Sequence, residues 1–228
     1  MRTKVLLAVP LAVLCLIAAP AKAEIYGFAP ITNTTGEAYT VAPQLSVEVE
    51  AVGSSQVLFT FYNAVGVTSS ITDIYFEDGA LFDIANVYNS GGVLFTDDPA
   101  NPRDLPGGNT LDPPFKQITG MDPAHYFSSD SASKQGGTIE NGVNHDGESV
   151  GILFDLQSDK YFADVIAAIN EGFVHPDPAQ NTSLRIGLHV QSIDGGSSDA
   201  FIMTPVPAAV LLGFLGLGAA GLKLRKFV

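Results

Sequence analysis

The chain has 228 residues, of which 46% are hydrophobic and 15% are charged. That length suits one domain, or at most two, with a hydrophobic core, and the composition excludes a wholly disordered chain. Eleven basic side chains stand against 24 acidic ones, and only five of the basic ones lie between Glu24 and Thr204, where all the acidic ones lie. This region would be repelled by phosphate backbones and anionic headgroups, which argues against binding to nucleic acid.

Residues 1–23 have the pattern of a cleaved signal peptide. Two basic residues precede an apolar stretch over 5–19, and Ala21 and Ala23 then form the small-x-small pattern that signal peptidase accepts. As a helix this stretch would cover about 22 Å, short of the ~30 Å hydrocarbon core of a membrane. The single cysteine, Cys15, lies in it, so the processed chain would have no disulfide, thiolate nucleophile or cysteine metal ligand.

Residues 204–228 form a second targeting segment. The proline motif Pro205-Val206-Pro207-Ala208 leads into an apolar run that is followed by three basic residues, Lys223, Arg225 and Lys226. Basic residues stay on the cytoplasmic side of a membrane, so we expect the acidic region to lie on the opposite side.

The apolar run, residues 208–222, predicts a short C-terminal transmembrane helix. It is a marginal span, which snorkelling of the flanking basic side chains would support. Gly213, Gly216 and Gly218 are small enough to let a partner helix approach closely.

The order of proline motif, short apolar helix and basic end resembles the PEP-CTERM sorting tails of Gram-negative bacteria. The nearest variant reads Val-Pro-Leu-Pro-Ala; here Val206 stands in the leucine position and Thr204 replaces the first valine. The resemblance implies recognition by an exosortase, cleavage near the proline motif, and release from the inner membrane or transfer to the cell surface. A plain C-terminal membrane anchor is the alternative.

Between the two ends, residues 24–203 predict an acidic domain built mainly of strands. Apolar and polar residues alternate with the period of half-buried strands. Gln56–Asn63 has apolar residues on both faces, which predicts a central strand. The expected strands are Gln44–Ala51, Gln56–Asn63, Ser70–Glu77, Leu81–Tyr88, Val93–Thr96, Ser149–Leu156 and Ser183–Ser192.

One segment, Asp159–Glu171, has apolar residues at helical spacing. Ser158 or Asp159 would cap this amphipathic helix and Gly172 would follow its end. The long polar segments Asp97–Asp112 and Ser128–Glu148 predict loops. The expected fold is therefore mainly β: a two-sheet antiparallel β-sandwich, jelly-roll-like, of about seven to nine strands with one helix.

The domain is also similar to a set of uncharacterised PEP-CTERM proteins. The likeness lies in residues 56–61, 70–76, 105–109, 151–156 and 184–191. It implies a shared fold and export route, and it carries no known activity.

Two motifs match catalytic patterns in the wrong context. Gly216–Gly221 fits the dinucleotide pattern G-x-G-x-x-G but lies in the apolar tail instead of a βαβ unit. Gly147–Gly151 fits the hydrolase pattern G-x-S-x-G, yet Ser149 precedes a predicted strand, whereas a nucleophile elbow joins a strand to a helix. We therefore predict no catalytic residue and no enzymatic activity.

A calcium site is the metal site that the polar loops suggest most readily. Asn144, Asp146 and Glu148 are candidate ligands, because calcium prefers several oxygen donors from acidic and amide side chains. Their spacing does not reproduce a known calcium loop, so we favour ordinary solvated charge and predict no cofactor.

The expected function is that of an exported, non-enzymatic protein, structural or adhesive in the exopolysaccharide or biofilm layer at the cell surface. Its expected partners are signal peptidase, an exosortase, the inner membrane through the tail before processing, and extracellular polysaccharide. One alternative is a carbohydrate-binding module, although the chain has no Trp; its candidate aromatic residues are Tyr62, Tyr75, Tyr88, Tyr126 and Tyr161. The other is a secreted glycoside hydrolase with paired carboxylates.

Overall fold

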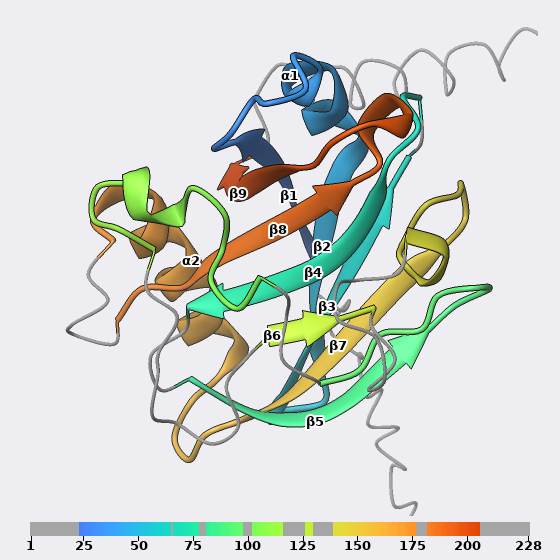
Figure 1. Cartoon of the computed structure of the whole chain (residues 1–228). Coiled ribbons are helices and arrows are strands. Elements are labelled where there is room, and N and C mark those ends of the chain that lie inside the picture. Colours follow the sequence, from blue (N-terminus) through green and yellow to red (C-terminus); the bar gives the residue numbers. More distant parts are fainter. Residues whose placement is uncertain are drawn as a thin grey trace, which may run out of the picture.

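The computed structural model describes residues 23–64, 66–77, 81–97, 102–115, 126–129, 139–176 and 182–205. Within these ranges the chain is mainly β, as predicted, with nine antiparallel strands and few helices (Figure 1). No helix in these ranges is long and apolar enough to cross a membrane. The predicted C-terminal helix lies outside the described residues.

The nine strands form one curled sheet through their hydrogen bonds, where we had expected two separate sheets. Their order across the sheet is β5-β7-β3-β2-β1-β9-β8-β4-β6. The strands are β1 (Ala23–Pro30), β2 (Leu45–Val52), β3 (Gln56–Asn63), β4 (Ser70–Glu77), β5 (Phe82–Asn89), β6 (Tyr126–Ser128), β7 (Ser149–Leu156), β8 (Arg185–Gln191) and β9 (Asp199–Pro205). The two α-helices are α1 (Ala38–Val41) and α2 (Phe162–Val174).

Six predicted strands are confirmed, three of them with the same ends: β3, β4 and β7. β3 lies between β2 and β7, which confirms it as a central strand. The predicted strand Val93–Thr96 was wrong as a strand, because only Thr96 forms an isolated bridge, with Ser128. β1, β6 and β9 were not predicted.

The curl brings the two edges of the sheet together. β5 is one edge and β6 is the other. In the segment that follows β5, the Thr96 N–H donates to the Ser128 carbonyl at 2.9 Å, and the Ser128 N–H donates to the Thr96 carbonyl at 3.1 Å. Two backbone hydrogen bonds therefore link the chain beyond one edge to the strand at the other.

The core lies inside the curl and is rich in phenylalanine. Phe59 on β3 meets Phe76 on β4 edge to face, with 5.3 Å between the ring centroids. Phe76 also meets Phe154 on β7 at 5.0 Å, and Phe154 stacks on Phe82 at 4.6 Å. Three of these rings belong to one arm of the curled sheet, formed by β5, β7, β3 and β2, and Phe76 belongs to the other arm, formed by β9, β8, β4 and β6. Their burial therefore holds one arm against the other.

The helix α2 confirms the predicted apolar face but not the predicted ends. Val165 and Ile169 are fully buried. Tyr161 is the N-cap residue, and its N–H donates to the Asp164 carboxylate at 2.8 Å. Asp159 lies in the preceding turn with a φ of 66°, so neither Ser158 nor Asp159 caps the helix. Gly172 does not follow the helix but lies within it, since the helix continues to Val174.

Candidate functional site

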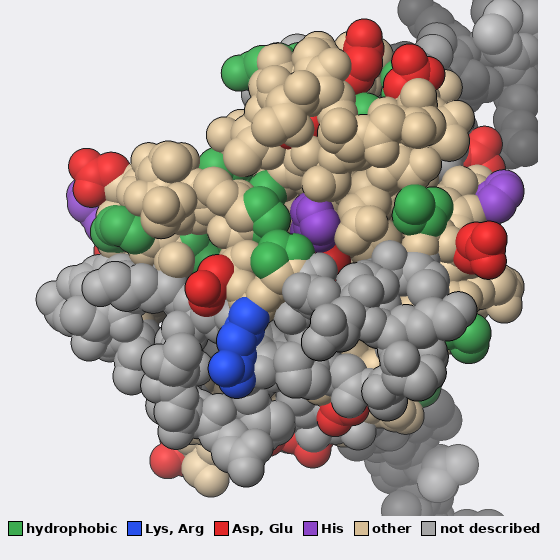
Figure 2. Space-filling view, viewed as in Figure 1, with side chains coloured by type: hydrophobic (Ala, Val, Ile, Leu, Met, Phe, Trp, Pro, Cys, Tyr) green, Lys and Arg blue, Asp and Glu red, His purple; other side chains and the backbone are tan. Residues whose placement is uncertain are grey.

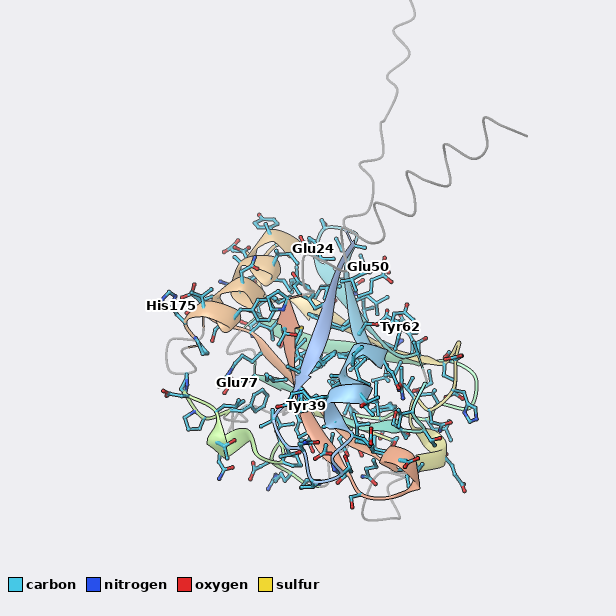
Figure 3. All side chains as sticks on the ribbon, turned by 90° about the horizontal axis from the view of Figure 1, so that it is seen from above. Glu24, Tyr39, Glu50, Tyr62, Glu77 and His175 are labelled. Carbon is cyan, nitrogen blue, oxygen red and sulfur yellow. The ribbon has the colours of Figure 1, made fainter. Side chains whose placement is uncertain are left out.

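The start of β1 and the end of β9 lie side by side. The two strands are antiparallel neighbours, with Tyr26 opposite Pro205 and Gly27 opposite Thr204. Ala23, the first residue of β1, lies opposite Glu50 on β2. Figure 3 shows Glu24 and Glu50 at this end. The chain therefore enters and leaves the sheet at the same end.

The predicted processing residues lie at this junction or beyond it. Thr204 and Pro205, which the sequence placed in the tail, belong to β9. The predicted signal-cleavage residue Ala23 begins β1. The other processing and tail residues lie outside the described ranges: Ala21, Val206, Pro207, Ala208, Gly213, Gly216, Gly218, Lys223, Arg225 and Lys226.

An open cavity of about 240 Å³ adjoins the end of β9. Its walls come from the C-terminal part of α2, from Arg185 at the start of β8, and from Thr204 and Pro205 themselves. Thr204 and Pro205, which lead into the tail, therefore form part of the wall of this cavity.

A second feature is the outer face of β5, β7, β3 and β2, which we call the tyrosine face. Strand register places Tyr88, Gly151, Thr60 and Glu48 in one row across the four strands. Tyr62 lies two residues from Thr60 on β3 and therefore shares its face. Tyr88 is 48% exposed and Tyr62 is 36% exposed.

Tyr62 contacts an acidic neighbour on this face. Its hydroxyl donates to the Glu48 carboxylate at 3.4 Å. Burial raises the pKa of Tyr62, and the negative charge of Glu48 raises it further, so the phenol stays neutral at physiological pH.

The structure separates the five tyrosines named as possible sugar-binding residues. Tyr75 is fully buried, and Tyr161 is exposed at the start of α2. The side chain of Tyr126 is outside the described part of the structure. Only Tyr62 and Tyr88 of the described set share the tyrosine face.

A buried polar cluster, which the sequence patterns did not predict, lies on the outer side of the arm formed by β9, β8, β4 and β6. Asp73 on β4 is fully buried and accepts hydrogen bonds from the Thr72 hydroxyl at 3.0 Å and the Ser128 hydroxyl at 2.8 Å. Nδ1 of His189, on β8, lies 3.0 Å from the same carboxylate. Ser128 is itself fully buried, so its hydroxyl serves this internal network.

A buried ion pair lies further along the same two strands. Arg185 on β8 pairs with Glu77 on β4, and both side chains are more than nine-tenths buried. Arg185 also donates to the carbonyl oxygens of Pro113 and Pro114, at 2.9 Å each, and stacks over the ring of Phe115. The pair therefore holds the segment 102–115 against the outer side of this arm.

The same segment is fixed at its other end by Tyr75. Its hydroxyl donates to the Pro102 carbonyl at 2.7 Å. Burial, followed by the charges of Asp73 and Asp104, raises the pKa of Tyr75 far above its ordinary value. The phenol therefore stays protonated as a donor.

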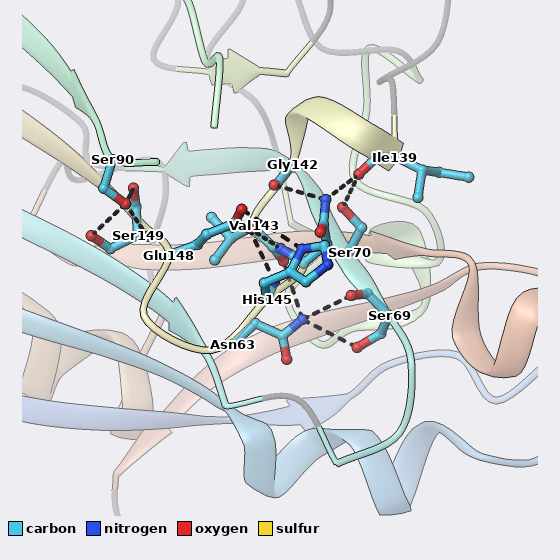
Figure 4. A network of polar contacts seen from close by, with 11 residues as sticks. Asn63, Ser69, Ser70, Ser90, Ile139, Gly142, Val143, His145, Glu148 and Ser149 are labelled. Carbon is cyan, nitrogen blue, oxygen red and sulfur yellow. Dashed lines mark hydrogen bonds and ion pairs between the residues drawn. The ribbon is translucent and has the colours of Figure 1, made fainter. Parts of the chain in front are cut away.

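The calcium candidates lie in a loop whose polar groups bind each other (Figure 4). The Glu148 carboxylate accepts from the backbone N–H groups of Asn144 and His145, at 2.9 and 3.0 Å. The Asn144 amide donates to the Ile139 carbonyl at 2.7 Å, and Asp146 is exposed. Among the described residues, no three His, Cys, Asp or Glu side chains form a metal-binding group.

Ser149, the serine of the G-x-S-x-G match, is the first residue of β7, as predicted. Its N–H donates to the Ser90 hydroxyl oxygen at 2.6 Å, and the Ser90 hydroxyl donates to its carbonyl at 2.9 Å. These contacts join the start of β7 to the end of β5.

Comparison of the chain with protein-family models, with curated proteins and with solved structures finds no match.

Proposed function

We propose that this protein is exported across the inner membrane, is sorted by an exosortase through its C-terminal tail, and acts as a structural or adhesive component of the exopolysaccharide layer. The observation that supports this proposal best is the pairing of the start of β1 with the end of β9. Each strand connects directly to one of the two apolar segments of the sequence.

The pairing suits a chain that is held in one membrane by both apolar segments before processing. An eight-residue strand such as β1 spans about 26 Å. Attachment points at opposite ends of such strands would place one of them well away from the membrane surface. With both at the same end, the folded domain can stand on the membrane while signal peptidase and exosortase act.

The acidic charge of the domain supports a location away from the membrane surface once the chain has been processed. On the face shown in Figure 2, acidic side chains are spread over several parts, and the basic side chains of the described residues occur at one place. Anionic headgroups would repel such a surface, so the domain would stay in solution or in the extracellular layer after release.

The architecture that we propose for this role is the jelly-roll-like sandwich, with the two arms of the curled sheet as its layers. Contacts such as Phe59 on Phe76, between β3 of one arm and β4 of the other, support this description. A packed two-layer domain would resist unfolding in an extracellular matrix.

The sorting proposal is tested by replacing the motif prolines in a host that has an exosortase. Pro205→Ala/Pro207→Ala should accumulate as the longer, tail-bearing form in the membrane fraction on immunoblots. Pro207→Ala alone, beyond the end of β9, should show the same defect without altering the sheet.

The matched control is Pro43→Ala, which replaces an exposed proline that is not part of the tail and should be processed like the wild type. Equal processing of all four proteins would overturn the proposal.

A further inference from the structure

The tyrosine face differs from the outer side of the other arm in being open to solvent. On β4 and β8, every outward residue from Asp73 to Glu77 and from Arg185 to His189 is buried. The segment 102–115 contributes to this cover through Leu105, which lies directly over Gly187. On the tyrosine face, Tyr62, Tyr88 and Asp155 are exposed. This face is therefore available to a ligand.

The face has two aromatic rings, and the β7 residues between their strands, Gly151 and Leu153, are buried. Tyr88 on β5 and Thr60 on β3 are separated by Gly151 on β7, which has no side chain. A Cβ on Gly151 would stand 3.2 Å from Leu58 Cδ1 and 3.5 Å from Tyr88 Cβ. A methyl group at this position would be in tight contact with Leu58, so the surface between the two strands is closely packed.

The spacing of the rings suits an elongated ligand. β5 and β3 are two strand spacings apart, and Tyr62 lies two residues beyond the row of Tyr88, so their Cα atoms are separated by about 12 Å. Several linked sugar rings can cover that distance. Aromatic side chains exposed on a flat face provide the apolar platform on which the faces of sugar rings stack.

The charge of the face selects among sugars. Glu48, Glu50, Asp83 and Asp155 lie on it by strand register, and the four strands that form it contain no Lys or Arg. Uronic-acid or sulfated polysaccharides would be repelled. A polymer with protonated amino groups would be attracted by the carboxylates, and its ammonium groups would also interact favourably with the tyrosine rings.

We propose that the tyrosine face binds a polysaccharide made of amino sugars with free amino groups, stacked on Tyr62 and Tyr88 and attracted by the carboxylates of the same face. The biological setting of this binding rests on the function proposed above, whereas the binding itself can be measured on the purified protein. It would give the protein a direct attachment to a cationic extracellular glycan.

The test uses the full chain, purified in a mild non-ionic detergent, and isothermal titration calorimetry with a glucosamine hexamer. We expect saturable binding that weakens as salt concentration rises. The N-acetylglucosamine hexamer should bind at least about tenfold more weakly because it lacks the ammonium charges, and an alginate oligomer should show no binding.

Two sets of variants separate stacking from charge. Tyr62→Ala/Tyr88→Ala should weaken hexamer binding at least about tenfold, whereas Tyr161→Ala, which replaces a still more exposed tyrosine at the start of α2, should bind like the wild type. Glu48→Gln/Glu50→Gln should reduce the preference for the free amine over the N-acetylated hexamer.

Three results would overturn the proposal. The first is absence of hexamer binding, and the second is unchanged affinity in the double-tyrosine variant. The third is binding of polylysine as strong as that of the hexamer, which would indicate attraction of any polycation. None of these results depends on tail processing, so they leave the sorting proposal to its own immunoblot test.

Discussion

Gly172 of α2 lies directly against the backbone of Leu184. A Cβ on Gly172 would stand 2.3 Å from the Leu184 carbonyl oxygen, far inside the limit of normal contact. One turn earlier in the helix, the Ala168 carbonyl accepts a hydrogen bond of 2.9 Å from the Leu184 N–H. The helix is therefore fixed to the residue that precedes β8 by one hydrogen bond and one close backbone contact.

We predict that Gly172→Ala destabilises the protein by about 1–3 kcal/mol, because the added methyl group forces the helix away from Leu184. The intrinsic preference of a helix for Ala over Gly would act in the opposite direction, by about 1 kcal/mol. The sign of the change in the free energy of unfolding, measured with urea, therefore shows whether the clash with Leu184 or the helix preference for Ala is the larger effect. A stabilised variant would contradict the close packing, and Ala167→Ser, on the exposed side of α2, should change stability by less than about 0.5 kcal/mol.

The buried pair of Glu77 and Arg185 leads to a second prediction. Arg185→Met removes the buried ion pair with Glu77 and the hydrogen bonds to the Pro113 and Pro114 carbonyls, so we expect a loss of about 3–5 kcal/mol. Because the pair is buried, this loss should change little between low and high salt. Arg103→Met, which replaces an exposed arginine, is the matched control and should have little effect.

A double-mutant cycle tests whether the two side chains act as a pair. Arg185→Met/Glu77→Met should cost less than the sum of the single replacements, because neither charge is then left alone in the interior. Additive losses would show that each residue stabilises the fold independently.

The sequence predicted the parts of this fold in which one residue pattern acts locally. β3 and β7 have apolar residues at every second position, so their ends and inner faces could be determined from alternation. The ends of β4 were also predicted, although a register shift between Ile71 and Asp73 interrupts its alternation. β1 and β9 were missed for local reasons. Gly27 interrupts the alternation of β1, and the apolar residues of β9 run into the tail motif.

The polar interior could not be predicted, because it depends on contacts distant in sequence. Glu77 and Asp73 resemble surface residues in the sequence, because two of their buried partners, Arg185 and His189, lie more than 100 positions away. The two tyrosines of the tyrosine face were named from the sequence as candidate sugar-binding residues, but the sequence did not show that they share one face. Tyr62 and Tyr88 come together only through the insertion of β7 between their strands.

The aromatic core supplies a third prediction. Phe76 contacts four other rings, those of Phe59, Phe61, Phe127 and Phe154. Phe76→Ala should lower the free energy of unfolding by about 3–5 kcal/mol, since the cavity lies between both arms of the sheet and cannot collapse without separating them. The comparison is Tyr88→Ala on the surface, for which a change below about 1 kcal/mol is expected. Similar losses in the two variants would show that Phe76 is not a central residue of the core.

Asp199 at the start of β9 organises the segment after β1. Its side chain accepts five hydrogen bonds from Thr32, Thr34 and Thr35, including a 2.7 Å bond from the Thr34 N–H and a 2.7 Å bond from the Thr35 hydroxyl. Burial by itself raises the pKa of a carboxyl group, but these donors outweigh it and lower the pKa of Asp199 below its ordinary value. The ionised form is therefore favoured in the folded protein.

The lowered pKa of Asp199 makes its contribution to stability dependent on pH. The contribution is fully present above the pKa of the unfolded chain, about 3.9, and is lost as pH falls through the lower pKa of the folded state. Asp199→Asn should therefore lower the free energy of unfolding at pH 7 by about 1–3 kcal/mol, and its deficit relative to the wild type should shrink as pH falls below about 4. Urea titrations at pH 7 and at a pH below about 4 measure the deficit. Asp194→Asn, which replaces an exposed aspartate, is the control and should show no deficit. A deficit of the same size at both pH values would show that the charge on Asp199 does not stabilise the segment, and that its shape alone does.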